Sequence, residues 1–186
     1  EIWPRDWSSD VCSSDLKLNN NLLVFTAPEE VKLEENVKYV KIFLAGTIDM
    51  GNSYNWQENF IKKLKDTVEK NNITDKIFIV FNPRRDEMLE DSSLETVQTQ
   101  ATWEMDMMDK SDLIFMNILS TSKSPISLLE LGLYSKSGKL LVRCTPEFYR
   151  FANVKTVCER FDIKLVTNKK ISLTEILEFY NEIKPT

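Results

Sequence analysis

No histidine occurs among the 186 residues of the chain, so the commonest neutral base and metal ligand of proteins is missing. This excludes nucleophile pairs in which histidine activates serine or cysteine, and we predict no metal site and no cofactor. The three cysteines, Cys12, Cys144 and Cys158, form no C-x-x-C pair, which is typical of a reduced, cytoplasmic protein. Any enzymatic chemistry must therefore depend mainly on carboxylates.

Other absences limit the partners. No run reaches eighteen apolar residues, so we expect no membrane-spanning segment. The net charge is −5, which argues against a nucleic-acid polymer as partner because a surface that binds phosphates needs a basic excess. The chain also lacks a full G-x-G-x-x-G and a G-K-[ST] pattern, so nothing supports a dinucleotide or Walker-type phosphate site.

The first fifteen residues differ from the rest of the chain. They show no useful hydrophobic period and contain a near-duplicate, SSDV at 8–11 and SSDL at 13–16. The stretch resembles a translated sequencing-adapter segment and lacks the basic and apolar regions of a signal peptide. We therefore expect residues 1–15 to be a non-native or disordered leader and residues 16–186 to form a single domain whose native start is missing.

Apolar strands alternate with amphipathic helices along this domain. We predict strands at 22–26, 39–44, 77–81, 113–119, 140–144 and 163–166, and helices from about 55, from 92 to 109, and at 127–136, 154–161 and 172–183. Such alternation is typical of a parallel sheet covered on both faces. Ligands bind beyond the carboxyl ends of such strands, so the segments that follow the strands matter most.

Glu130 stands out because leucines surround it in the sequence, at 128, 129, 131 and 133. Carboxylates are seldom buried unless they are paired or used. With Ser127 as the expected N-cap, Glu130 falls in the first turn of a helix, where the helix end favours the ionised form and suits a nucleophile. The alternative is a capping box, in which Glu130 only returns a hydrogen bond to the Ser127 backbone.

A second carboxylate, Glu104, lies on the helix predicted to end at 109. The expected apolar stripe of this helix comprises Leu94, Val97, Ala101, Met105 and Met108. Glu104 flanks that stripe and can reach a cleft edge, where desolvation would raise its pKa and make it a proton donor; otherwise it is an ordinary boundary residue. Asp106 and Trp103 are expected to point outward, and an outward Trp103 suggests a partner subunit. Two such carboxylates match the acid–nucleophile pair of retaining glycoside chemistry.

Three further groups are candidates for binding. The turn formed by Ala45, Gly46 and Thr47 follows a buried strand, where backbone can approach a ligand closely. Arg84 and Arg85 follow Asn82 at the end of another strand and form either an anion clamp or a solvated surface pair. Ser124 and Ser127 could donate hydrogen bonds to a sugar hydroxyl or a phosphate, although Ser127 could equally be only a cap.

Several stretches, in the same order, resemble the nucleoside 2-deoxyribosyltransferase-like family. They are residues 43–48 (FLAGTI), 55–57 (NWQ), 82–85 (NPRR), 103–104 (WE), 124–132 (SPISLLELG), and 148–150 (FYR) with Asn153 and Val154. The resemblance runs from about residue 22 to residue 166. It implies a flavodoxin-like three-layer α/β/α fold with a parallel, mostly five-stranded sheet, and cleavage of the N-glycosidic bond of a nucleoside.

The resemblance also implies roles for individual residues. It assigns to Glu130 the nucleophile that forms a covalent sugar–enzyme intermediate. The acidic group that helps to protonate the base and holds the sugar hydroxyl falls on Glu104 or, as an alternative, Asp106. Asn153 lies in the last matching stretch and is a candidate for substrate binding. Homodimers or larger homo-oligomers are implied, with residues of one subunit completing the site of its neighbour.

Two departures from the family pattern leave the substrate open. The first buried strand reads Ile42-Phe43-Leu44, where well-studied transferases carry a tyrosine, and residues 120–124 read STSKS, where they carry an aspartate pair. The acceptor can therefore be another base or water, and the substrate a nucleoside or its 5′-monophosphate. One alternative is a glycohydrolase that acts on NAD or a nucleotide-derived signal. Another is a non-catalytic nucleotide-binding module, in which Glu130 bonds only Ser127 and no cleft reaches it.

Overall fold

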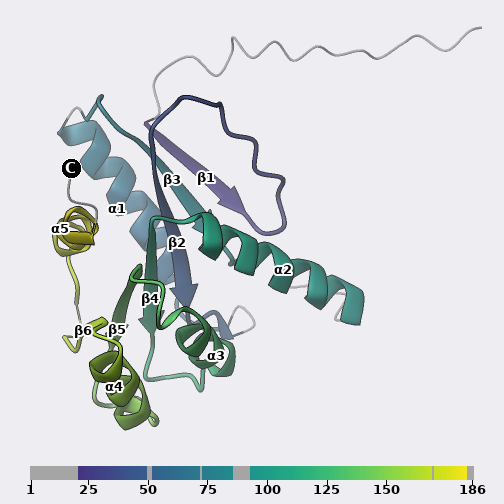
Figure 1. Ribbon diagram of the computed structural model, residues 1–186, viewed down its shortest axis with the longest axis vertical. Coiled ribbons are helices and arrows are strands. Elements are labelled where there is room, and N and C mark those ends of the chain that lie inside the picture. Colours follow the sequence, from purple (N-terminus) through teal and green to yellow (C-terminus); the bar gives the residue numbers. More distant parts are fainter. Residues whose placement is uncertain (1–20, 50–51, 72, 86–92, 169, 184–186) are drawn as a thin grey trace, which may run out of the picture.

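The computed structural model describes residues 21–49, 52–71, 73–85, 93–168 and 170–183, so the expected leader at 1–15 lies outside the described residues. Six parallel strands form one sheet in the order β1-β3-β2-β4-β5-β6 (Figure 1). The predicted α/β class and flavodoxin-like architecture are confirmed, and the sheet has the six strands that the apolar runs predict, where the family resemblance implied mostly five. The strands are β1 (Leu22–Thr26), β2 (Tyr39–Gly46), β3 (Ile77–Asn82), β4 (Leu113–Ile118), β5 (Leu140–Cys144) and β6 (Lys164–Val166).

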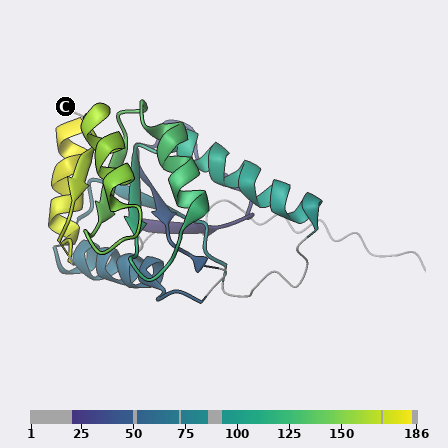
Figure 2. The ribbon, with the colours of Figure 1, turned by 90° about the horizontal axis from the view of Figure 1, so that it is seen from below.

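Helices cover both faces of the sheet. They are α1 (Trp56–Lys70), α2 (Leu94–Lys110), α3 (Pro125–Tyr134), α4 (Phe151–Arg160) and α5 (Leu173–Ile183). Figure 2 shows α1 and α5 on one face and α2, α3 and α4 on the other. None of the helices in the described ranges is long and apolar enough to cross a membrane.

Each face of the sheet has its own hydrophobic core, because successive strand residues point to opposite sides. On β2, Ile42 and Leu44 pack beneath α1 and α5, whereas Phe43 and Ala45 pack beneath the other three helices. All six residues of β4 are buried. The continuous apolar runs that predicted a doubly covered sheet are explained by this arrangement.

Local capping signals placed three helix starts correctly. The side chains of Asn55 and Ser93 accept hydrogen bonds from the backbone N–H groups of Glu58 (3.1 Å) and Thr96 (3.3 Å). Ser172 and Glu175 form a reciprocal capping box at α5, at 2.8 and 3.1 Å. By contrast, α3 and α4 begin two and three residues earlier than predicted, at Pro125 and Phe151.

The sheet order places a crevice at the carboxyl ends of β2 and β4. These strands are neighbours, but the chain passes from β2 to β3 on one side, where β1 lies beyond β3, and from β4 to β5 and β6 on the other. Such a switch point is where open α/β sheets bind their ligands. The segments that follow β2 and β4 are therefore the ones positioned to form a site.

Gly46, at the end of β2, is required by the close approach of β4. Its φ is +125°, and a Cβ placed on it would lie 2.2 Å from the Asn117 carbonyl oxygen. We expect Gly46→Ala to lower the free energy of unfolding by about 3 kcal/mol, because it combines a strained backbone with a clash against main chain. Urea unfolding followed by circular dichroism measures this.

The matched control for this prediction is Gly132→Ala. Gly132 lies inside α3, and no atom lies within 4 Å of an added Cβ. Alanine should there stabilise the fold by up to about 1 kcal/mol through helix propensity. Equal effects of the two substitutions would contradict the account of Gly46.

Candidate active site

Helix α2 turns a different face toward the sheet than the one predicted. Trp103 and Met107 are buried together with Met108 of the predicted stripe, whereas Leu94 and Val97 of that stripe are 73% and 49% exposed. The apolar period alone did not identify the inward face, because large side chains on its other side bury more area against the sheet.

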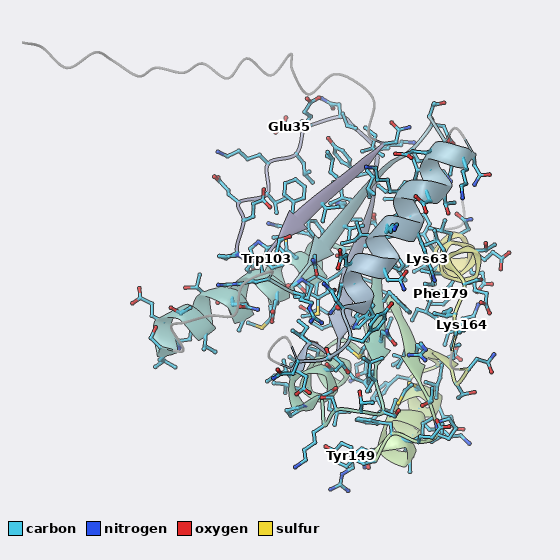
Figure 3. All side chains as sticks on the ribbon, turned by 180° about the vertical axis from the view of Figure 1, so that it is seen from behind. Glu35, Lys63, Trp103, Tyr149, Lys164 and Phe179 are labelled. Atoms are coloured by element: carbon cyan, nitrogen blue, oxygen red, sulfur yellow. The ribbon has the colours of Figure 1, made fainter. Side chains whose placement is uncertain are left out.

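Trp103 is consequently an inward residue, and the prediction that it points outward toward a partner was wrong. Its ring lies 6.4 Å from the Phe43 ring and 6.3 Å from the Phe81 ring, measured between centroids. Its Nε1 donates a hydrogen bond to the Glu29 carbonyl oxygen at 2.8 Å. Figure 3 shows Trp103 where α2 meets the sheet. The residue fixes the rotation of α2, and with it the position of Glu104.

Glu104 is half-buried on α2 and lies beside Gln100, one helical turn earlier. The Gln100 amide nitrogen Nε2 donates to Glu104 Oε1 at 2.8 Å and to the Pro83 carbonyl oxygen at 3.3 Å. Burial raises the pKa of Glu104, as the sequence predicted, while the Gln100 hydrogen bond and the charge of Arg85 oppose that shift. Glu104 is thus suited to hold a proton and to release it.

Glu130 does not lie in the first turn of α3, and the predicted cap at Ser127 was wrong. The helix begins at Pro125, preceded by Ser124 in the left-handed region with φ +45°. Ser127 is the third residue of the helix, and Glu130 is the sixth. Proline is favoured at a first helical position, which accounts for the earlier start. Since Ser127 lies inside the helix, the capping-box alternative for Glu130 does not hold either.

The electrostatic state of Glu130 also differs from the prediction. The residue is 8% exposed, and burial raises the pKa of its carboxyl to about 8, with a further contribution from the negative charge of Glu104. The helix end that was expected to keep it ionised is a turn away, and the effect of a helix dipole falls off within one turn. Burial and the nearby charge of Glu104 therefore favour the protonated form of Glu130.

Both carboxyl groups line one cavity of about 510 Å³ at the switch point of the sheet. Its wall combines backbone after β2, one side of α2 and the start of α3. Such a mostly apolar cavity with a few polar groups is typical of a small-molecule site. The other lining residues are Ala45, Gly46, Ile48, Asp49, Pro83, Val97, Gln100, Ala101, Ser122, Ser124, Pro125, Ile126 and Ser127.

The arginines after β3 have different environments. Arg84 is buried and braces the loop before α1, since its Nη2 donates to the Ser53 carbonyl oxygen at 2.9 Å. The side chain of Asn82 accepts a hydrogen bond from the Arg84 backbone at 3.1 Å. Arg85 lies near enough to Glu104 to lower its pKa, and its buried Nε has no hydrogen-bond partner among the described residues. Of these three predicted binding residues, Arg85 is thus the one whose charge acts on Glu104, and none of the three is among the residues that line the cavity.

Thr47 connects the end of β2 to the start of α3. Its Oγ1 lies 2.6 Å from Ser124 Oγ and accepts a hydrogen bond from the Leu119 backbone N–H at 2.9 Å. Thr47 is buried and does not line the cavity, whereas Ser124 does. Thr47 therefore positions the segment that leads into the Glu130 helix.

Besides Thr47, Asn82, Arg84 and Arg85, two more predicted residues do not line the cavity. Asp106 is exposed and is not among its lining residues, so the acidic partner of Glu130 in this site is Glu104. Asn153 is exposed on α4 and lines a separate cavity of about 310 Å³ that Leu128 and Leu131 also line. A ligand in the cavity that Glu104 and Glu130 line would therefore not contact Asn153, which lines the other cavity.

Sequence reasoning did not single out three polar residues of the cavity. Asp49 lies in the turn after β2 and has φ +52°. Its position just after a buried strand is the sequence feature that could have identified it. Gln100 precedes Glu104 by four residues, the spacing at which helical side chains meet. Ser122 lies between β4 and α3 in the STSKS segment, which the sequence marked as a departure from the family pattern without singling out this residue.

The influence of Arg85 on Glu104 gives a prediction. Removing its charge in Arg85→Gln should raise the pKa of Glu104, because the Arg85 charge lowers that pKa in the native protein. If Glu104 acts as a proton donor, the falling limb of the profile of kcat/KM against pH should move to higher pH. Lys110→Gln, an exposed position on the same helix, is the control and should leave the profile unchanged. A profile unaltered in both variants would contradict the proximity of Arg85 to the reacting acid.

Comparison with known families finds one match. The family model described as nucleoside 2-deoxyribosyltransferase like matches residues 39–148. This span begins with β2 and includes both Glu104 and Glu130. A search of curated proteins finds no match.

Proposed function

Because the chain belongs to the nucleoside 2-deoxyribosyltransferase-like family, we propose that it cleaves the N-glycosidic bond of a (deoxy)nucleoside or a nucleoside 5′-monophosphate. The observation that carries the proposal is the pair of carboxyl groups, Glu104 and Glu130, in one largely apolar cavity at the switch point of the sheet. Burial raises the pKa of both groups, and the negative charge of Glu104 raises the pKa of Glu130 further, so the pair favours holding one proton. One proton on two carboxyl groups is what a retaining mechanism needs.

In the first step, the single proton of the pair passes from Glu130 to Glu104, and the ionised Glu130 oxygen attacks the anomeric carbon of the sugar. The bond from that carbon to the base nitrogen breaks, and its electron pair goes to the base, which takes the proton of Glu104. The positive charge that develops on the sugar stabilises the Glu130 carboxylate, whose charge burial disfavours. The products are a glutamyl–sugar ester at Glu130 and a free base.

In the second step, an acceptor nitrogen of another base, or water, attacks the same carbon. The ester bond breaks, its electron pair returns to the Glu130 carboxylate, and Glu104 takes the proton that the acceptor releases. Three polar side chains line the cavity and would form hydrogen bonds with the hydroxyl groups of the sugar or the polar groups of the base. They are the hydroxyls of Ser124 and Ser127 and the carboxylate of Asp49. The positive charge of Arg85 would attract an anionic group of the substrate.

The alternative of a non-catalytic binding module required Glu130 to bond only the Ser127 backbone and no cleft to reach it. Instead, Glu130 lines the cavity and Ser127 lies within the helix. Burying an ionisable carboxyl group lowers the stability of the fold, and a purely structural role for Glu130 would bring no compensating benefit. These two observations favour the enzymatic alternative.

A product assay tests the proposal. The protein is incubated with a panel of nucleosides, their 5′-monophosphates and NAD, with and without an acceptor base, and free base is quantified by chromatography. Release of base that Glu130→Gln abolishes supports the proposal, and exchange of bases separates a transferase from a hydrolase. Release from NAD alone would favour the glycohydrolase alternative. No release from any substrate, with binding intact, would contradict the proposal.

We further propose that the protein forms homodimers or larger homo-oligomers through an apolar face on α2 and α3. Exposed on this face are Leu94, Val97, Met105, Ile126, Leu129 and Leu133, each 43% to 73% exposed. Patches of this kind mark interfaces more often than free surface. Val97 and Ile126 also line the cavity, so a neighbouring subunit docked here would border the site.

Leu129→Glu should dissociate such an assembly, because it places a charge in the middle of the face. Size-exclusion chromatography with light scattering measures the mass of the particle. Val24→Glu, at an exposed apolar position on β1, is the control and should leave the mass unchanged. A wild-type protein that is monomeric at 100 µM would refute the proposed assembly.

A further inference from the structure

A second cavity lies on the opposite face of the sheet from Glu130. It measures about 610 Å³ and is bounded by α1, the start of α5 and the carboxyl ends of β4 and β5. This volume is within the range of roughly 300–1,000 Å³ that small-molecule sites occupy. The chemistry proposed for Glu130 and Glu104 makes no use of it.

Aromatic rings form an apolar wall in this cavity. Phe115 of β4 meets Trp56 of α1 edge to face at 5.6 Å between centroids, and stacks with Phe60 of α1 at 5.7 Å. Tyr54, before α1, is 63% exposed and also lines the cavity. Together these rings form an apolar wall against which an aromatic ligand can pack.

Cations complete the lining. Lys63 of α1, Arg143 of β5 and Lys170 before α5 line the cavity, and among the described residues no acidic side chain does. Figure 3 shows Lys63 on the side of α1 toward α5. Because the chain as a whole carries a net charge of −5, three cations and no acid in one concave region is a local excess that attracts anions.

Arg143 is positioned by its neighbours. Its Nη1 donates to the side-chain oxygen Oδ1 of Asn117 at 2.7 Å, and its Nε donates to the Asn168 carbonyl oxygen at 3.2 Å. The start of α5 contributes little, because the Glu175 carboxylate already accepts from the Ser172 N–H and hydroxyl, both at 2.8 Å. The side-chain cations, not the helix end, therefore define the charge of the cavity.

We propose that this cavity is a second ligand site that binds a small aromatic anion. The ring would lie against the wall of Trp56, Phe60 and Phe115, and the anionic group would contact Lys63 and Arg143. A phosphate ester and a carboxylate share this chemistry, since both accept charge-assisted hydrogen bonds from lysine and arginine. This proposal does not depend on the N-glycosidic activity, so each of the two can be tested separately.

Isothermal titration calorimetry with naphthalene compounds of matched shape tests the proposal. We expect 1-naphthyl phosphate or 1-naphthoate to bind, and 1-naphthol and inorganic phosphate each to bind at least about tenfold more weakly, because each lacks one half of the interaction. The tighter of the two aromatic anions identifies the preferred group. Failure of both to bind, or equally tight binding of 1-naphthol, would overturn the proposal.

A pair of variants on α1 locates the bound anion. Lys63→Glu should weaken binding of the aromatic anion at least about tenfold, because a cation at the ligand becomes an anion. Lys65→Glu changes an exposed lysine of the same helix that does not line the cavity, so affinity should remain within twofold. Thermal unfolding establishes that both variants are equally folded. If Lys63→Glu leaves affinity unchanged, or if both variants lose it alike, the ligand lies elsewhere and the proposal is wrong.

Discussion

Glu130→Gln is expected to reduce the rate of base release by about 10⁴-fold or more, because the amide cannot form the ester to the sugar. The substitution preserves the shape of a buried side chain, so the loss would be chemical and not structural. The measurement is kcat for the best substrate of the panel described above. Substrate affinity should change far less than kcat, since the residue acts mainly in the transition state.

Two further variants calibrate this loss. Glu104→Gln should cost about 10²-fold to 10⁴-fold, the usual contribution of a general acid, and less for substrates whose base leaves readily without a proton. Glu95→Gln, an exposed carboxylate in the first turn of α2, should have no effect. A Glu130→Gln enzyme that retains more than a tenth of the wild-type rate would show that another group attacks the sugar.

The same Glu130→Gln substitution is expected to stabilise the fold at pH 8. Burial and Glu104 raise the pKa of Glu130 from 4.5 to about 8, so between these values the folded state binds a proton that the unfolded state has released. Stability contributed by this group is therefore present at low pH and declines as pH rises from about 4.5 to about 8. Glutamine stays neutral throughout and avoids the decline.

The gain from Glu130→Gln should be near zero at pH 4.5 and at most about 4–5 kcal/mol at pH 8, since each pKa unit corresponds to about 1.36 kcal/mol. Urea unfolding of the wild type and the variant at both pH values measures it. Glu95→Gln should show no such pH-dependent gain. A gain of the same size at both pH values would mean that Glu130 is already ionised in the folded protein at low pH.

Features that depend on neighbours in sequence were predictable. Apolar runs placed all six strands within two residues of their ends, and serine or asparagine followed by glutamate placed the starts of α1 and α5. The start of α3 was misplaced although Pro125 was visible, because Ser127 and Glu130 also fit a capping pattern. Two local patterns predicted different starts for α3, and the helix begins at the one that Pro125 predicts.

Features that depend on distant parts of the chain were not predictable in the same way. The inward face of α2 depends on Trp103 meeting Phe43 and Phe81, from two different strands. The pKa of Glu130 depends on burial and on Glu104 of another helix, so helix position alone gave the wrong direction. Gly46 was expected to make room for a ligand, yet the nearest atoms to an added Cβ belong to Asn117 of β4.

Trapping the sugar on the protein tests the role of Glu130 most directly. The enzyme is incubated with a substrate nucleoside that carries fluorine on C2 of the sugar, which slows breakdown of a glycosyl ester by destabilising the cationic transition state. The protein is then digested with trypsin and analysed by mass spectrometry. Glu130 is the one acidic residue in the tryptic peptide of residues 124–136. The proposed mechanism predicts that this peptide gains the mass of the sugar; release of base without that gain, or a gain on the peptide that contains Glu104, would contradict it.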